Sequence, residues 1–199
     1  MSESSTTRPS LLLRLRDPQE REAWSQFVHI YSPLVYRIAR RAGFQDADAA
    51  DVTQEVMQTV ARSMPKFEYD RNRGSFRGWL KTVTRSRIAD HQRRLARQAE
   101  VGRDSQTLAL LEHVPDDIDN EEIWEIEYRQ SLFQWAAEQS RNDFQPSTWS
   151  AFWRTSVQGT AVKAVAEELR MSVGAVYIAR SRVTAHLKKL IAQVEGDDA

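Results

Sequence analysis

Apolar side chains recur every three or four positions along most of this chain, and this spacing is the feature that most limits its fold. Between residues 46 and 63, for example, Ala49, Val52, Val56 and Val60 follow it. Residues three and four apart share one face of a helix, whereas a strand needs alternation with a period of two. No segment alternates in that way, and only 7 glycines and 6 prolines interrupt the 199 residues. We therefore expect an all-α protein, made of two small helical domains.

Helix start and stop signals divide this pattern into segments. Asp17 and Ser32 each precede a proline and predict helix starts, while Gly43 and Pro65 predict helix ends. The expected helices begin near residue 10 and then cover 18–31, 33–43, 46–63, 75–98, 121–141, a segment after 146, 160–170 and 172–194. The expected organisation is a disordered tail at 1–9, a first domain at 10–97, an acidic linker at 98–125, a second domain at 126–194 and a tail at 195–199.

The composition narrows the chemistry. The chain has no cysteine, which excludes disulfides, thiolate metal sites and a cysteine nucleophile. Its four histidines are scattered, and no glycine-rich phosphate loop is present. We therefore expect no enzyme, no metal site and no cofactor. No apolar run approaches the roughly 20 residues of a membrane span, and the start MSESSTTRPS has no apolar signal core, so we expect a cytoplasmic protein without membrane insertion.

The formal net charge of zero hides an uneven distribution. Residues 1–97 carry 18 Lys+Arg and 11 Asp+Glu, residues 98–128 carry 1 and 10, and residues 129–199 carry 9 and 7. Basic segments attract polyanions such as nucleic acids. The acidic stretch between them has two interpretations. It is either a solvated linker, or a segment that lies transiently against a basic DNA-binding face or imitates DNA in a pore.

The stretch VKAVAEELRMSVGAVYIARSR (162–182) has the pattern of a helix-turn-helix. Ala166 is small where the two helices cross, Ser172 caps the second helix, and Arg170 stands in the turn where the pattern favours glycine. Such a second helix inserts exposed side chains into the major groove. The residues expected there are Ser172, Ala175, Tyr177, Ile178, Arg180, Ser181 and Arg182. The alternative is a plain helical hairpin that closes a core.

A second informative stretch, residues 74–97, is rich in arginine and contains a single acid, Asp90. A row of cations contacts phosphates and gives salt-dependent affinity. The aromatic side chains of Phe67, Tyr69 and Trp79 can stack on unpaired bases. The alternative is a solvated basic face over an ordinary core, to which Phe76 and Leu80 are expected to belong.

Three stretches of the chain resemble the extracytoplasmic-function (ECF) group of bacterial RNA polymerase sigma factors. They are DADAADVTQEV (46–56), RGSFRGWLKTVTRSRIADHQRR (73–94) and VAEELRMSVGAVYIARSRV (165–183), and their order and separation also match. The resemblance covers about residues 11–97 and 126–194. It implies a sigma region 2-like domain, a sigma region 4-like domain, and a subunit that binds core RNA polymerase, reads two promoter elements and aids DNA melting.

For the first domain, the resemblance implies two sets of residues. The acidic helix would dock on the β′ clamp of the polymerase through Asp48, Asp51, Gln54 and Glu55. The loop 67–75 would accept a base flipped from the minus-ten element, and the helix after it would bind the adjacent DNA. The residues implied for this second role are Phe67, Tyr69, Arg73, Ser75, Arg77, Trp79, Lys81, Arg85 and Ser86.

For the second domain, the resemblance implies that the helix from Ser172 reads the minus-thirty-five element, while the acidic connector follows the RNA exit path. The implied partners are promoter DNA, core polymerase (β′ clamp and β flap), and a regulator, either an anti-sigma factor or a regulatory kinase. A standalone helix-turn-helix regulator is the alternative function, and such a protein would bind duplex DNA tightly by itself.

The sequence departs from the family pattern near the acidic site. Ala50 stands where the family often has Glu, so one negative charge is missing, and Ser86 stands where many members carry Asn. Thr53 lies beside the missing charge, and its phosphorylation would add about −2 there. The alternative is that Thr53 is an ordinary helix residue.

Overall fold

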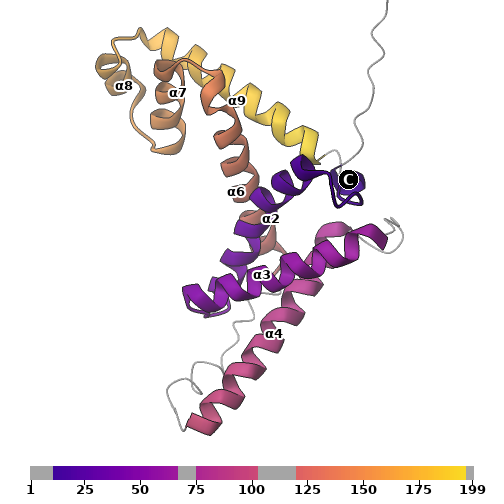
Figure 1. Cartoon of the computed structure of the whole chain (residues 1–199). Coiled ribbons are helices and arrows are strands. Elements are labelled where there is room, and N and C mark those ends of the chain that lie inside the picture. The colour runs from indigo at the N-terminus through magenta and orange to yellow at the C-terminus, as the bar shows by residue number, and fades with distance from the viewer. Residues whose placement is uncertain (1–10, 67–74, 103–119, 196–199) are drawn as a thin grey trace, which may run out of the picture. The chain divides into compact units, whose positions relative to one another are not determined.

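The computed structural model describes residues 11–66, 75–102 and 120–195 (Figure 1). All regular structure in these ranges is helical, which confirms the all-α class. The chain divides into two compact units, and the boundary between them lies between Ser131 and Leu132. This boundary falls inside a helix, a few residues beyond the expected start of the second domain at 126.

The first unit is built around one central helix. Its elements are α1 (Leu11–Arg14), α2 (Arg21–Arg41), α3 (Asp46–Ser63), a 3₁₀ turn at Met64–Lys66, α4 (Phe76–Gly102) and the first part of α6 (Glu121–Ser140). α3 packs against both α2 and α4 and has the limits expected from the sequence. Its predicted apolar stripe of Ala49, Val52, Val56 and Val60 is fully buried.

One predicted break in the first unit is wrong. Ser32 and Pro33 were expected to start a new helix, but α2 continues through Pro33 from Arg21 to Arg41. A proline inside a helix removes one backbone hydrogen bond. The residues on both sides of it, among them Ile30, Tyr31 and Leu34, are nevertheless completely buried. Burial of one continuous apolar face therefore outweighs the lost bond.

The inner face of α4 is more polar than the sequence suggested. Phe76 and Leu80 are buried as expected, whereas Val83, which helical spacing also predicts on this face, is only partly covered. The stripe continues instead through Thr84, Ile88 and His91. Thr84 can be buried because its hydroxyl donates a hydrogen bond to the Leu80 carbonyl oxygen over 2.8 Å.

The second unit contains the predicted helix-turn-helix. Its elements are the second part of α6, a 3₁₀ turn at Arg141–Asp143, α7 (Pro146–Phe152), a π-helical turn at Trp153–Val157, α8 (Val162–Glu168) and α9 (Val173–Glu195). Ala166 lies in the small core between α8 and α9, with Ala151, Val165, Val176 and Ala179. A larger residue at Ala166 would separate these helices, as the sequence pattern predicts.

The turn between α8 and α9 contains a left-handed residue. Arg170 has φ +54°, a conformation that non-glycine residues rarely adopt. It lets the Met171 amide donate to the Ala166 carbonyl over 2.8 Å, which closes the end of α8. The structure therefore needs the glycine-like conformation that the pattern predicts, although arginine supplies it.

Within the described residues, no helix is long and apolar enough to cross a membrane.

Candidate nucleic-acid interface

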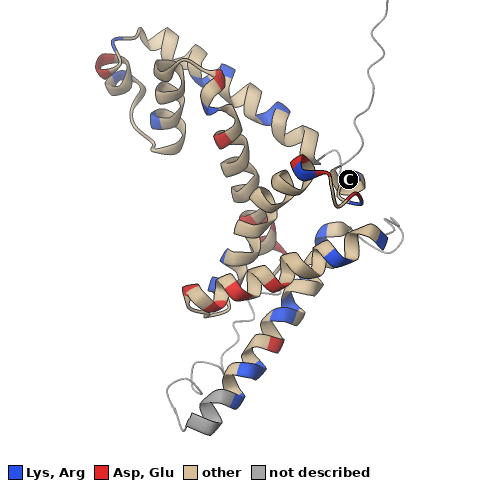
Figure 2. Ribbon diagram, viewed as in Figure 1, with Lys and Arg blue, Asp and Glu red and all other residues tan. Residues whose placement is uncertain are grey.

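The four polar residues predicted on α3 fall into two pairs. Asp51 and Gln54 are exposed, and within the described part of the chain neither has a polar side-chain partner. Asp48 and Glu55 are partly covered and already bind cationic or polar groups of α4. Figure 2 shows the contrast between the two helices, with acidic positions along α3 and basic positions along α4.

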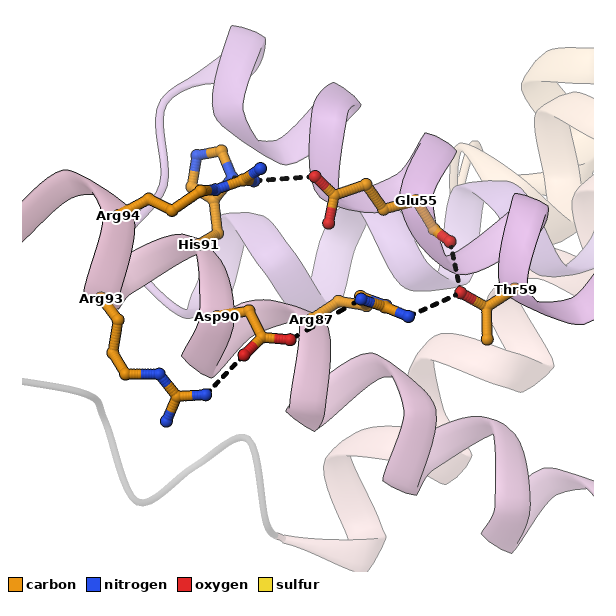
Figure 3. A network of polar contacts seen from close by, with 7 residues as sticks. All are labelled: Glu55, Thr59, Arg87, Asp90, His91, Arg93 and Arg94. Carbon is orange, nitrogen blue, oxygen red and sulfur yellow. Dashed lines mark hydrogen bonds and ion pairs between the residues drawn. The ribbon is translucent and has the colours of Figure 1, made fainter.

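His91 joins these two helices. Its Nδ1 lies 2.6 Å from a guanidinium nitrogen of Arg94, and its Nε2 lies 2.9 Å from Asp48 Oδ1. Because Arg94 can only donate, Nδ1 accepts, and the imidazole must donate from Nε2 to Asp48. The same guanidinium nitrogen of Arg94 contacts Glu55 Oε1 over 2.7 Å (Figure 3). One buried ring and one arginine thus hold both carboxylates.

Two further arginines of α4 are engaged within the unit. Arg87 donates to the Thr59 hydroxyl over 3.2 Å and lies 3.7 Å from Asp90, which also binds Arg93 over 2.5 Å (Figure 3). Asp90, the single acid of the basic stretch, therefore neutralises part of its charge. The predicted phosphate-binding row is consequently less cationic than a count of arginines suggests.

The first two turns of α4 hold most of the described residues predicted for the minus-ten element. The Ser75 hydroxyl accepts the Gly78 amide over 3.1 Å and caps the helix. Trp79 is partly covered and packs against Phe76, with ring centroids 5.5 Å apart. Arg85 and Ser86 are exposed on the following turn. Three other predicted residues, Phe67, Tyr69 and Arg73, lie outside the described residues.

Arg77 and Lys81 on the same turns carry the expected positive charge, but acids of α6 face them. Glu125 Oε2 lies 3.0 Å from an Nη of Arg77, and Glu121 Oε2 lies 2.7 Å from Nζ of Lys81. Glu121 and Glu125 lie where the expected linker (98–125) and the expected helix (121–141) overlap. A usable signal was present, because Trp124 and Tyr128 are four residues apart and give this acidic segment an apolar side.

Thr53, the residue predicted for phosphorylation, is 7% exposed. Its hydroxyl donates to the Ala49 carbonyl over 2.7 Å, so a kinase would have to open this turn. Thr53 also lines a groove between α2 and α3, together with Val28, Pro33 and Met57. Nearby, the Tyr36 hydroxyl donates a hydrogen bond to Asp46 over 3.1 Å. The pKa of Tyr36 is raised, mainly by desolvation and to a smaller extent by the Asp46 carboxylate.

In the second unit, the start of α9 presents the predicted reading face. The Ser172 hydroxyl accepts the Ala175 amide over 3.1 Å and caps the helix. Tyr177 and Ile178 are each 55% exposed, and the Arg180 guanidinium lies 5.8 Å from the Tyr177 ring centroid. The predicted residues Ser181 and Arg182 are also exposed, and Ala175 is partly covered.

A groove lined by aromatic side chains in the second unit was not predicted. Phe144 stacks on Trp149, Trp149 on Trp153 and Trp153 on Phe133, with ring centroids 5.9–6.5 Å apart. Phe144, Trp149 and Trp153 line an open groove of about 1010 Å³ whose polar wall includes Arg141. Helical spacing predicts Trp149 and Trp153 on the helix after residue 146, but spacing alone cannot show that they line an open surface.

Comparison with known proteins identifies the first unit. The model of Sigma-70 region 2 matches residues 27–98, from within α2 to near the end of α4. Over 97 residues the chain is 31% identical to the ECF RNA polymerase sigma factor SigE of Mycolicibacterium smegmatis, a stretch that covers 49% of this chain and 32% of that relative. The chain thus matches about a third of the length of this relative. No solved structure matches the chain. The region 2 match is to residues 27–98, and this match together with the similarity to SigE supports assignment of the chain to the ECF-type sigma factors.

Proposed function

We propose that this chain binds core RNA polymerase and directs it to promoters by reading two DNA elements and aiding melting. The observation that carries this proposal is that a Sigma-70 region 2 and a helix-turn-helix with an exposed reading face lie in two separate compact units of one chain. A bipartite promoter requires two readers of this kind. Core polymerase supplies the chemistry of RNA synthesis.

Polymerase binding is assigned to α3 and to the aromatic groove. Asp51 and Gln54 are exposed and unpartnered within the described residues, so a basic surface of the β′ clamp can bind them without breaking an existing contact. Asp48 and Glu55 would contribute after exchange of their contacts to α4. In the second unit, the stacked rings of Phe144, Trp149 and Trp153 offer an apolar surface for the β flap.

Recognition of the minus-ten element is assigned to the start of α4 and the loop before it. Extruding a base from a duplex costs a few kcal/mol, which stacking and phosphate contacts must offset. Trp79 is accessible enough to offer a ring surface, and Arg77, Lys81 and Arg85 supply positive charge. The assignment of Phe67, Tyr69 and Arg73 to the base pocket rests on the sequence resemblance.

Recognition of the minus-thirty-five element is assigned to α9. Arg180, Ser181 and Arg182 can donate hydrogen bonds to base edges or phosphates, whereas Tyr177 and Ile178 present apolar surface. In the major groove the apolar partner for such side chains is the methyl group of thymine. We therefore propose that the upstream element contains thymines at the positions facing Tyr177 and Ile178.

Reconstitution with core polymerase tests this function. Purified chain should co-migrate with core enzyme and redirect run-off transcription on genomic DNA to a small set of start sites. Asp51→Arg should abolish both effects without unfolding the chain, because Asp51 is exposed. Glu22→Arg makes the same charge change at a side chain that is 89% exposed on α2, and it should leave both effects intact.

Two outcomes would overturn the proposal. One is failure of the wild-type chain to co-migrate with core enzyme or to redirect initiation. The other is tight binding of the chain alone to a palindromic duplex as a dimer, which is the behaviour of a standalone regulator.

A further inference from the structure

The first three turns of α6 are acidic, yet one side of them belongs to the core of the first unit. Trp124, Glu127 and Tyr128 are 6%, 3% and 2% exposed. The Tyr128 ring stacks on Tyr31 with centroids 5.8 Å apart, and the Arg77 guanidinium lies 4.6 Å from its centroid. An exposed linker would show none of this burial. The segment 121–131 therefore packs as part of the first unit.

Glu127 fixes the position of this segment. Its carboxylate accepts hydrogen bonds from Nε of Arg37 and, over 2.8 Å, from Nε of Arg41. Arg37 also donates to the Glu127 carbonyl over 2.8 Å and to the Ser131 hydroxyl over 2.6 Å. A buried carboxylate is tolerated only when its charge is compensated in this way. None of these anchoring contacts involves α4.

Glu121 and Glu125 perform a different task. They lie one helical turn apart and reach Lys81 and Arg77, the two cations on the first turns of α4. The Lys81 side chain is only 16% exposed, whereas that of Glu121 is 85% exposed. A lysine ammonium is usually solvated. Because Lys81 has lost most of its contact with water, the carboxylate of Glu121 compensates its charge. The carboxylates occupy the positions from which phosphate oxygens would accept hydrogen bonds.

We propose that residues 121–131 are an intramolecular competitor for DNA, a helical anionic cover on the cationic start of α4. In the free chain Glu121 and Glu125 satisfy Lys81 and Arg77, and nucleic-acid phosphates can bind these two cations only when the carboxylates leave. The proposal rests on the proposed function, because it takes the start of α4 to be a DNA-binding surface. It goes beyond that function by naming an occupant of the surface and the segment that must move.

The test compares two double variants of the full-length chain. Glu121→Gln with Glu125→Gln keeps the shapes of the side chains and removes the two competing charges. Glu122→Gln with Glu22→Gln removes the same net charge from two exposed acids for which the structure shows no contact to α4. Affinity of each free chain for a partly single-stranded oligonucleotide is measured over a range of salt concentrations.

We expect the first variant to bind about 3–10-fold more tightly than the wild type, and the control to change less than 2-fold. Each extra phosphate contact steepens the slope of log K against log salt by about 0.7–0.9, so two contacts predict a slope steeper by about 1.4–1.8. Equal gains in both variants would mean that net charge alone acts. No gain in the first variant would mean that the ion pairs only stabilise the fold. Either result overturns the proposal.

Amide hydrogen exchange gives a second readout. Amides of residues 121–131 should exchange slowly in the free wild-type chain and faster when oligonucleotide saturates it. Unchanged protection with bound DNA would show that the cover stays in place, which contradicts the proposal.

Adding Lys81→Ala to the double variant Glu121→Gln, Glu125→Gln distinguishes a failure of the proposed cover from a failure of the proposed DNA-binding role of α4. Loss of the gained affinity supports the DNA role of α4, whereas no loss refutes that role. Run-off transcription with core polymerase tests the proposed function, and its outcome does not depend on whether residues 121–131 cover α4.

Discussion

Arg170 provides the sharpest prediction about stability, because its backbone conformation and its side chain can be tested separately. Its φ of +54° lies in the left-handed region, which costs an L-residue roughly 1–2 kcal/mol. Arg170→Gly removes that strain. Glycine in turn adds about 0.4–1 kcal/mol of conformational entropy to the unfolded chain. The expected net stabilisation of the second unit is therefore about 0.5–1 kcal/mol.

Thermal unfolding of the full chain, followed by calorimetry, measures this change. In a domain of 60–100 residues, 1 kcal/mol shifts Tm by roughly 4–8 °C, so Arg170→Gly should raise the Tm of the second unit by about 2–8 °C. Arg170→Ala is the matched control, because it removes the same exposed side chain but keeps the Cβ atom that causes the strain. It should give no comparable rise.

A third variant tests the reasoning in the opposite direction. Gly159 has φ +71°, and a Cβ atom added there would meet nothing within 4 Å. Gly159→Ala should therefore destabilise the same unit by about 0.5–1 kcal/mol, because the backbone strain exceeds the entropy that the unfolded chain loses when glycine is replaced. If Arg170→Ala stabilises as much as Arg170→Gly, the gain comes from removing the arginine charge, and the argument from backbone conformation is refuted.

Three other predictions concern the two interfaces and the buried carboxylate. Ile178→Ala should weaken binding to one upstream element about 3–10-fold with little change in Tm, since Ile178 is exposed. Val157→Ala, which changes an exposed residue outside α9, should not weaken it. In gel-shift assays, Arg182→Ala should lower affinity for a subset of promoters, whereas Lys81→Ala should weaken binding to all of them and flatten the salt slope; equal effects on every promoter would contradict this division. Glu127→Gln should lower the free energy of unfolding by about 1.5–3 kcal/mol in urea titrations, and a loss under 0.5 kcal/mol would show that its two arginine contacts add little.

Much of the fold could be predicted from the sequence because local patterns determine it. α3 has regular apolar spacing and a proline shortly after its end, and its limits agree with the prediction. The helix-turn-helix was predictable for the same reason, and Arg170 was already visible as an exception to its pattern. In these segments, local preference and tertiary packing favour the same structure.

The errors and omissions arose where distant residues decide the structure. Pro33 predicts a helix start locally, but burial of the residues around it keeps α2 continuous. Thr84 and His91 looked too polar for the inner face of α4, and they are buried because each finds a hydrogen-bond partner. The acidic start of α6 looked like part of a linker, because its partners Arg37 and Arg41 lie more than 80 residues away in the chain.

The contacts of His91 and Arg94 have a consequence for how the two faces of the first unit communicate. The carboxylates that a basic protein surface would attract already have partners on α4: Glu55 binds the Arg94 guanidinium, and Asp48 binds His91, which accepts a hydrogen bond from Arg94. A partner that binds Asp48 and Glu55 therefore weakens their contacts to α4 and leaves the positive charge of Arg94 available on that helix. By thermodynamic reciprocity, a polyanion that binds Arg94 raises the affinity of that partner for Asp48 and Glu55 by the same factor.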